Sequence, residues 1–163
     1  MKINIGHNNP PNPKKAIEKN IKRKIPILDR DPQLFNDIPI PSYIELSLID
    51  VCNRDCNFCP KSDENVAPNT YNKMEKNLID KLIRDLQKIN FEGFFTMCGY
   101  GEPLLHPNIL EITNSLGEFW GIEIVTNGDP LNKKNLKDLY NSKVSKLVVS
   151  MYDGPEQVEK FKK

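Results

Sequence analysis

The chain of 163 residues has little of several features that would define a protein class. No stretch approaches the ~18 apolar residues that a membrane-spanning helix needs, so the sequence predicts no membrane span. Residues 1–15 lack the apolar core of a secretory signal, which argues against export. A net charge of +1 gives no overall attraction to nucleic acid or to a membrane surface. The composition, 28% charged and 38% hydrophobic, is typical of one globular domain with a core.

Cysteine is also scarce, and its distribution is uneven. Of the four cysteines, Cys52, Cys56 and Cys59 lie within "DVCNRDCNFCP" (50–60), and Cys98 stands apart. Disulfide pairing among the first three would leave at least one of them to reach Cys98. Clustered cysteines in a chain without an export signal usually bind metal or perform redox chemistry. We therefore expect a metal site in a reducing compartment, the cytoplasm, and no disulfide framework.

The spacing of the cysteines leaves three kinds of metal site open. A structural zinc module pairs its cysteines and needs a second pair of ligands, but beyond Cys98 the chain has only His7 and His106. An iron–sulfur electron carrier normally uses four thiolates, and here Cys98 would be the fourth. The third alternative is a four-iron cluster on the three clustered thiolates alone, which leaves one iron open to bind a substrate.

The chain divides at about residue 41. Residues 1–41 form a Pro-rich, basic extension with seven of the thirteen prolines, and residues 42–163 form the expected core domain. The run "KKAIEKNIKRK" (14–24) has six basic residues and one acidic residue. One short basic run is a weak signal for RNA binding, so we interpret it as a solvated, partly helical lead-in and expect no nucleic-acid partner.

The core domain alternates between predicted strands and predicted helices. The strands are 43–49, 93–98, 121–126 and 145–151. Helices are predicted over 74–90, with Asn72 and Glu75 as a capping box, after Pro107, over 132–142 and from 153 onward. This alternation predicts an α/β fold with a parallel sheet built from right-handed βαβ units. Four strands are too few for a full eight-stranded barrel, so we expect an open sheet or part of a smaller barrel.

Polar or glycine-rich segments follow each predicted strand. They are the cysteine loop, "CGYGEPLLHP" (98–107), "TNGD" (126–129) and "SMYDG" (150–154). Ligands of parallel α/β proteins bind at the carboxyl ends of the strands, so these segments are expected to meet at one site.

Two motifs in these segments resemble those of the radical S-adenosylmethionine (radical SAM) superfamily. The spacing Cys52-x3-Cys56-x2-Cys59, with Phe58 before and Pro60 after the last cysteine, resembles the signature of that family. "GYGEP" (99–103) resembles its Gly-Gly-Glu motif, at the end of the second strand as in the family. The resemblance spans residues 43–153 and implies a partial (β/α)6 TIM-like barrel, truncated after about four β/α units.

The resemblance also implies cofactors, a reaction and residue roles. The three clustered cysteines would bind a [4Fe-4S] cluster, and SAM would chelate the fourth iron. Reduction by a partner such as ferredoxin or flavodoxin would cleave SAM to a 5′-deoxyadenosyl radical, which abstracts hydrogen from an unknown substrate. Gly99, Gly101 and Glu102 would approach the SAM ammonium group, Phe58 the adenine and Ser150 the ribose. Asp153 is a weaker candidate for the ribose contact, and Thr126 and Asn127 lie at the same edge and could line the pocket.

Each role has a simpler alternative. Glu102 could stabilise the first turn of a helix, "TNGD" could be an ordinary turn, and Cys98 could be a small buried residue. The family's fifth and sixth β/α units and its cysteine-rich C-terminal domains have no counterpart in the sequence. We therefore leave open whether this chain is active without a partner.

Overall fold

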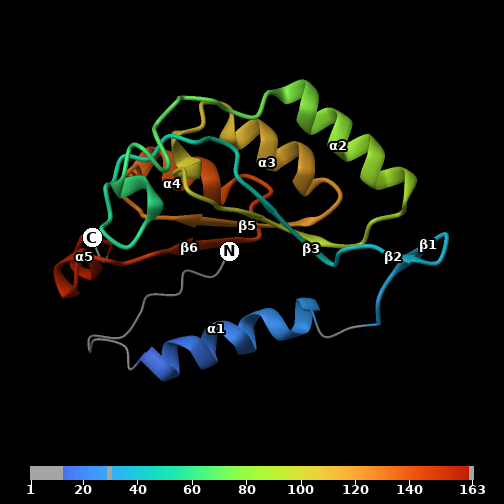
Figure 1. Ribbon diagram of the computed structural model, residues 1–163, viewed down its shortest axis with the longest axis horizontal. Helices are drawn as coiled ribbons and strands as arrows, with labels where there is room; N and C mark the ends of the chain where they lie inside the picture. Colours follow the sequence, from blue (N-terminus) through green and yellow to red (C-terminus); the bar gives the residue numbers. More distant parts are fainter. Residues whose placement is uncertain (1–12, 29–30, 162–163) are drawn as a thin grey trace.

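Four parallel strands form the sheet around which the chain is arranged (Figure 1). The computed structural model describes residues 13–28 and 31–161. The strands lie in the order β3 (Tyr43–Leu46), β4 (Phe94–Met97), β5 (Gly121–Thr126), β6 (Lys146–Val149). The connecting helices are α2 (Lys76–Lys88), α3 (Ile109–Gly117) and α4 (Lys133–Tyr140), and α5 (Pro155–Lys160) follows β6. The predicted α/β class and partial barrel are confirmed: within the described residues the sheet is open and each strand neighbours the next.

The hydrophobic core lies between the sheet and helices α2, α3 and α4. Side chains alternate along each strand, so one face of the sheet carries large apolar residues. Phe95, Met97, Ile122 and Ile124 on this face have no exposed surface. The helices supply the other half of the core with Ile79, Ile83, Leu86, Ile112, Leu116 and Leu139. This packing fixes the strands and therefore the positions of the loops at their ends.

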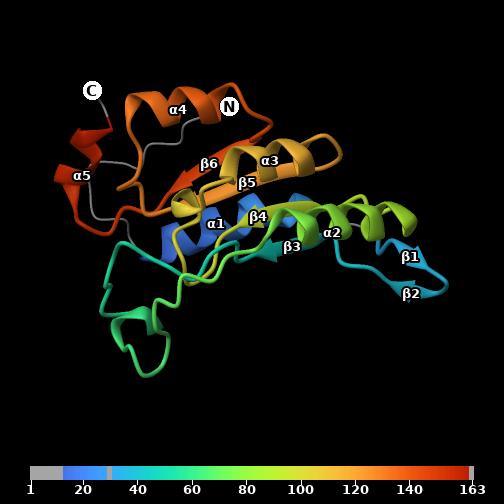
Figure 2. The same cartoon turned by 90° about the horizontal axis from the view of Figure 1, so that it is seen from above.

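The opposite face of the sheet is polar and is covered by α1 (Pro13–Leu28), as Figures 1 and 2 show. Glu45, Thr96, Glu123 and Lys146 stand side by side across the four strands. Glu123 is 1% exposed, and its carboxylate pairs with Arg23 of α1 and with Lys146 at 3.1 Å. A second residue of α1, Lys24, lies 3.4 Å from Glu45. The basic run is thus helical, as interpreted, and at least two of its cations neutralise carboxylates of the sheet.

Two local features differ from the sequence-based expectation. A two-stranded hairpin, β1 (Leu34–Phe35) and β2 (Ile38–Pro39), was not predicted; its turn residues Asn36 and Asp37 have φ of 51° and 62°, which Asn and Asp tolerate. The predicted capping box at Asn72 and Glu75 is wrong. The Asn72 carbonyl instead accepts the Asp50 N–H, so the backbone stays extended and α2 starts at Lys76 with no side-chain cap.

The loops after the strands meet at one end of the sheet, on the left in both views (Figures 1 and 2). Parallel strands in register bring their carboxyl ends to the same edge, which places the cysteine loop beside the segments that follow β4, β5 and β6. No helix among the described residues has the length and apolar character needed to cross a membrane.

Candidate functional site

A cavity of about 110 Å³ lies at the carboxyl edge of the sheet, and segments that follow all four strands line it. The expected convergence of these segments is therefore confirmed. Of the site residues named from the sequence, only Asp153 does not line this cavity. The others that line it are Cys52, Cys56, Phe58, Cys59, Gly99, Gly101, Glu102, Thr126, Asn127 and Ser150.

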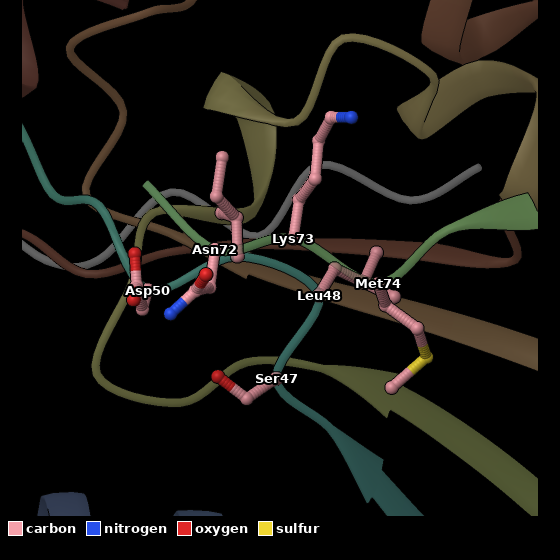
Figure 3. Close-up of a pocket in the computed structure, with 7 residues that line it drawn as sticks. Ser47, Leu48, Asp50, Asn72, Lys73 and Met74 are labelled. Carbon is pink, nitrogen blue, oxygen red and sulfur yellow. The ribbon is translucent and has the colours of Figure 1, made fainter. Parts of the chain in front are cut away.

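A larger cavity, of about 240 Å³, lies between residues 47–50 and 72–74 (Figure 3). It contains no cysteine. Asp50 and Asn72 lie close together in it, and the Lys73 side chain extends away from Asp50. One Asp50 oxygen accepts a hydrogen bond from Thr70, whereas Oδ1 is buried without a hydrogen-bond partner in the described structure. The smaller cavity is the better candidate site despite its size, because the potential ligands line it.

The three clustered cysteines occupy a loop that is held by a few specific hydrogen bonds. The Cys52 N–H donates to Asn69 Oδ1 at 3.1 Å, and the Cys59 N–H donates to the Cys56 carbonyl at 2.8 Å. Pro60 then begins the short 3₁₀ helix η1 (Pro60–Ser62). All four cysteines of the chain are free and partly exposed, so the expected absence of disulfides agrees with the structure. The thiols are accessible from the cavity.

Burial raises the pKa of two of the thiols that line the cavity, Cys56 and Cys98. Burial raises the pKa of the Cys56 thiol, and the positive charge of Arg54 acts in the opposite direction. For Cys98, which is more deeply buried, desolvation raises the pKa to about 11. Burial therefore disfavours the thiolate form of Cys98, which metal binding needs.

Gly99 and Gly101 allow the loop after β4 to lie directly against the segment that leads to the cysteines. Gly99 has φ of +127°, and a Cβ there would stand 2.5 Å from the Ser47 hydroxyl oxygen. A Cβ on Gly101 would overlap the Ile49 carbonyl oxygen. Close backbone approach is the reason these two positions need glycine.

Glu102 is 2% exposed, and its carboxylate is held by donors of the chain itself. Oε1 accepts from the Leu104 N–H at 3.0 Å and from the Thr126 hydroxyl at 2.6 Å, and Oε2 accepts from the Asn127 N–H at 2.8 Å. Glu102 is therefore the N-cap of the short 3₁₀ helix η2 (Pro103–Leu105), not an acid within its first turn, and it also fixes the loop after β5. Each carboxylate oxygen can accept more than one hydrogen bond, so these donors leave room for an ammonium group to bind as well. That contact stays a prediction.

Arg54, which sequence reasoning missed, joins the cysteine loop to two other loops. Its Nε and Nη2 donate to the Asp129 carboxylate at 2.6 and 2.8 Å. Its Nη1 and Nη2 donate to Asp153 at 2.9 and 2.6 Å. These hydrogen bonds raise the pKa of Arg54 and hold the pKa of Asp129 below its usual range. The signal in the sequence was an arginine between two cysteines together with an acid after each of β5 and β6.

Asn127 links the same loops through its amide. Nδ2 donates to Asn53 Oδ1 at 2.9 Å and lies 3.8 Å from the Cys52 sulfur. Its own backbone N–H is bound by Glu102. "TNGD" is thus a turn, with Gly128 at φ of +83°, and it also lies beside Cys52.

The model of one protein family, the radical SAM superfamily, matches residues 46–163. The chain belongs to the radical SAM superfamily. A curated relative is the S-adenosyl-L-methionine-dependent 2-deoxy-scyllo-inosamine dehydrogenase of Niallia circulans, 31% identical over 69% of this chain and 46% of the relative. The GTP 3',8-cyclase of Trichodesmium erythraeum is 32% identical over 67% of this chain and 34% of the relative.

Solved structures agree with the radical SAM assignment. BtrN in complex with AdoMet and 2-DOIA superposes with a TM-score of 0.64 at 30% identity, over 71% of this chain and 47% of that one. BtrN in an open conformation superposes with a TM-score of 0.61 at 30% identity, over 72% of this chain and 53% of that one. The chain spans about half of these structures, and a third to a half of the curated relatives.

The residues present fit the cofactors that the radical SAM family implies, a [4Fe-4S] cluster and SAM. Cys52, Cys56 and Cys59 are free thiols that line one cavity together with Cys98, so the thiolate donors that an iron–sulfur cluster needs are present there. Among the described residues, no three Cys, His, Asp or Glu side chains gather closely enough to hold a single metal ion, as structural zinc would require. Thiolates that bind three different irons lie farther apart than thiolates that share one ion.

The remaining cavity residues offer apolar and polar surfaces for a nucleoside such as SAM. Phe58 is 65% exposed and lies against Tyr152, with ring centroids 5.0 Å apart. On the β6 side, the Ser150 N–H donates to the Thr126 carbonyl at 2.8 Å, which sets the position of its side chain beside the cavity. Cys98 also lines the cavity.

Proposed function

We propose that this chain is a radical SAM enzyme, or the part of one that binds the cofactors, with Cys52, Cys56 and Cys59 as the ligands of a [4Fe-4S] cluster. The observation that carries the proposal is the single cavity that these three free thiols share with the glycine-rich loop after β4. When bound, the reduced cluster and SAM supply a 5′-deoxyadenosyl radical that abstracts a hydrogen atom from an organic substrate.

The chain's own residues would hold and orient SAM. Gly99 and Gly101 line the cavity, and the buried Glu102 carboxylate supplies negative charge near them. Phe58 offers an exposed aromatic face to the adenine, and Ser150 offers a hydroxyl to the ribose. These roles are supported by the placement of all five residues around one cavity.

The partners follow from the reaction. An external reductant must deliver one electron, and we propose a ferredoxin or flavodoxin for this role. The exposed cysteine loop gives such a protein access to the cluster. A labile three-thiolate cluster also favours a reducing compartment, the cytoplasm.

Iron and acid-labile sulfide analysis after anaerobic reconstitution tests the ligand assignment. We expect about four irons and four sulfides per chain, as the cluster type dictates. Cys59→Ala should lose most of the cluster, and Cys98→Ala is the matched control that should retain it. An electron carrier would lose its cluster in both variants, because Cys98, which also lines the cavity, would then be the fourth ligand. Zinc without sulfide would contradict both assignments.

A further inference from the structure

We propose that Arg54 is a positioning residue that fastens the cysteine loop to the loops after β5 and β6 and so presets the geometry of the three thiols. This inference rests on the proposed function for its meaning, since the loop is the proposed cluster-binding loop. The hydrogen bonds from Arg54 to the loops after β5 and β6 are present in the chain without its cofactors.

The loops that carry the two carboxylates are held by hydrogen bonds that do not involve Arg54. Gln157 of α5 is 5% exposed; its Oε1 accepts the Asp153 N–H and its Nε2 donates to the Asn127 carbonyl, both at 3.2 Å. Glu102 holds the backbone of Asn127 from the other side. The loops after β5 and β6 are therefore held in place by their own hydrogen bonds. Arg54 attaches the cysteine loop to them.

Other contacts also hold the cysteine loop there. The Cys52 N–H donates to Asn69, and Asn53 accepts from Asn127 and donates to Asp129 at 3.3 Å. The Phe58 ring lies against Tyr152. Arg54 contributes four charge-assisted hydrogen bonds at 2.6 to 2.9 Å, and its side chain is only 13% exposed. Ordering a loop costs conformational entropy, and this residue supplies the strongest bonds available to offset it.

The charges explain why Arg54 acts on the loop and not on a substrate. Its single positive charge faces two carboxylates, and Lys160 lies 3.7 Å from the Asp129 carboxylate. The N–H groups of its guanidinium are therefore committed to the two carboxylates of the neighbouring loops. Both carboxylates lie in reach of one planar guanidinium, a geometry that the point charge of lysine does not reproduce.

Hydrogen–deuterium exchange of the cofactor-free protein tests the proposal. In Arg54→Gln, amides of residues 52–59 should exchange about tenfold faster, a modest figure because Asp129 and Asp153 are 33% and 53% exposed. Exchange in β4 and β5 should not change. Arg54→Lys should give an intermediate rate, and the pair Asp129→Asn with Asp153→Asn should reproduce Arg54→Gln. Arg84→Gln, at an exposed position of α2, is the control.

The outcomes separate this inference from the proposed function. Faster exchange confined to 52–59, together with reduced iron uptake, supports both. Faster exchange in a protein whose wild-type form takes up no cluster supports the fastening and contradicts the proposed function. Unchanged exchange in Arg54→Gln, or an increase that spreads evenly over the sheet, overturns the fastening whatever the iron content.

Discussion

Replacing Glu102 by alanine should destabilise the cofactor-free chain, because three donors lose their acceptor. The Leu104 N–H, the Thr126 hydroxyl and the Asn127 N–H all donate to this carboxylate, which is 2% exposed. A buried donor left without a partner costs about 1–3 kcal/mol, so the three together should lower the free energy of unfolding by at least about 3 kcal/mol. That is a large share of the ~5–15 kcal/mol by which single domains are stable.

Urea denaturation, followed by the fluorescence of the single tryptophan, measures this loss. Trp120 is 8% exposed and packs against Phe91 and Phe95, so its emission reports the core. Glu64→Ala, at an exposed position, is the control and should change the free energy of unfolding by less than about 0.5 kcal/mol. Equal stability of the two variants would refute the assignment of Glu102 as the residue that fixes the β4 and β5 loops.

Three further predictions concern single residues. Gly101→Ala should lower both stability and iron content, measured by denaturation and by iron analysis, because its Cβ would overlap the Ile49 carbonyl; normal values for both would contradict the close packing. Asp129→Asn should destabilise the chain near neutral pH. Because Arg54 holds the pKa of Asp129 below its unfolded value of about 3.9, the difference in free energy of unfolding between wild type and Asp129→Asn should shrink as the pH falls below about 4. A difference that grew at acidic pH would contradict the pairing. Trp120→Phe should cost about 1–3 kcal/mol in thermal unfolding, because the indole N–H donates to the Phe91 carbonyl at 2.6 Å and both groups are buried; an unchanged melting temperature would count against that bond.

Much of the fold was predictable because the relevant signals are local. Alternating apolar residues indicate β5, and an amphipathic pattern indicates α2. Burial of one face makes apolar residues recur along the sequence with the repeat of the strand or of the helix. The start of α2 was not predictable in this way. Asn72 has a typical capping residue type, but its backbone pairs with Asp50, a contact 22 positions away that no local pattern reports.

The candidate site was likewise predictable only in part from the sequence. The cysteine spacing and the "GYGEP" segment indicated the cavity residues, because parallel strands bring their carboxyl ends to one edge. The partners of Arg54 and Glu102 depend on which side chains meet across that edge. Asp153 illustrates the difference: its position made it a weaker candidate than Ser150 for the ribose contact, whereas in the structure its carboxylate binds Arg54.

The central claim is that three cysteines hold a [4Fe-4S] cluster whose fourth iron is open to SAM. Electron paramagnetic resonance of the reconstituted, dithionite-reduced protein tests it most directly, with spectra recorded before and after SAM is added. The account predicts a [4Fe-4S] signal that shifts with SAM, in wild type and in Cys98→Ala alike. A cluster signal that SAM leaves unchanged, and that disappears in Cys98→Ala, would contradict it.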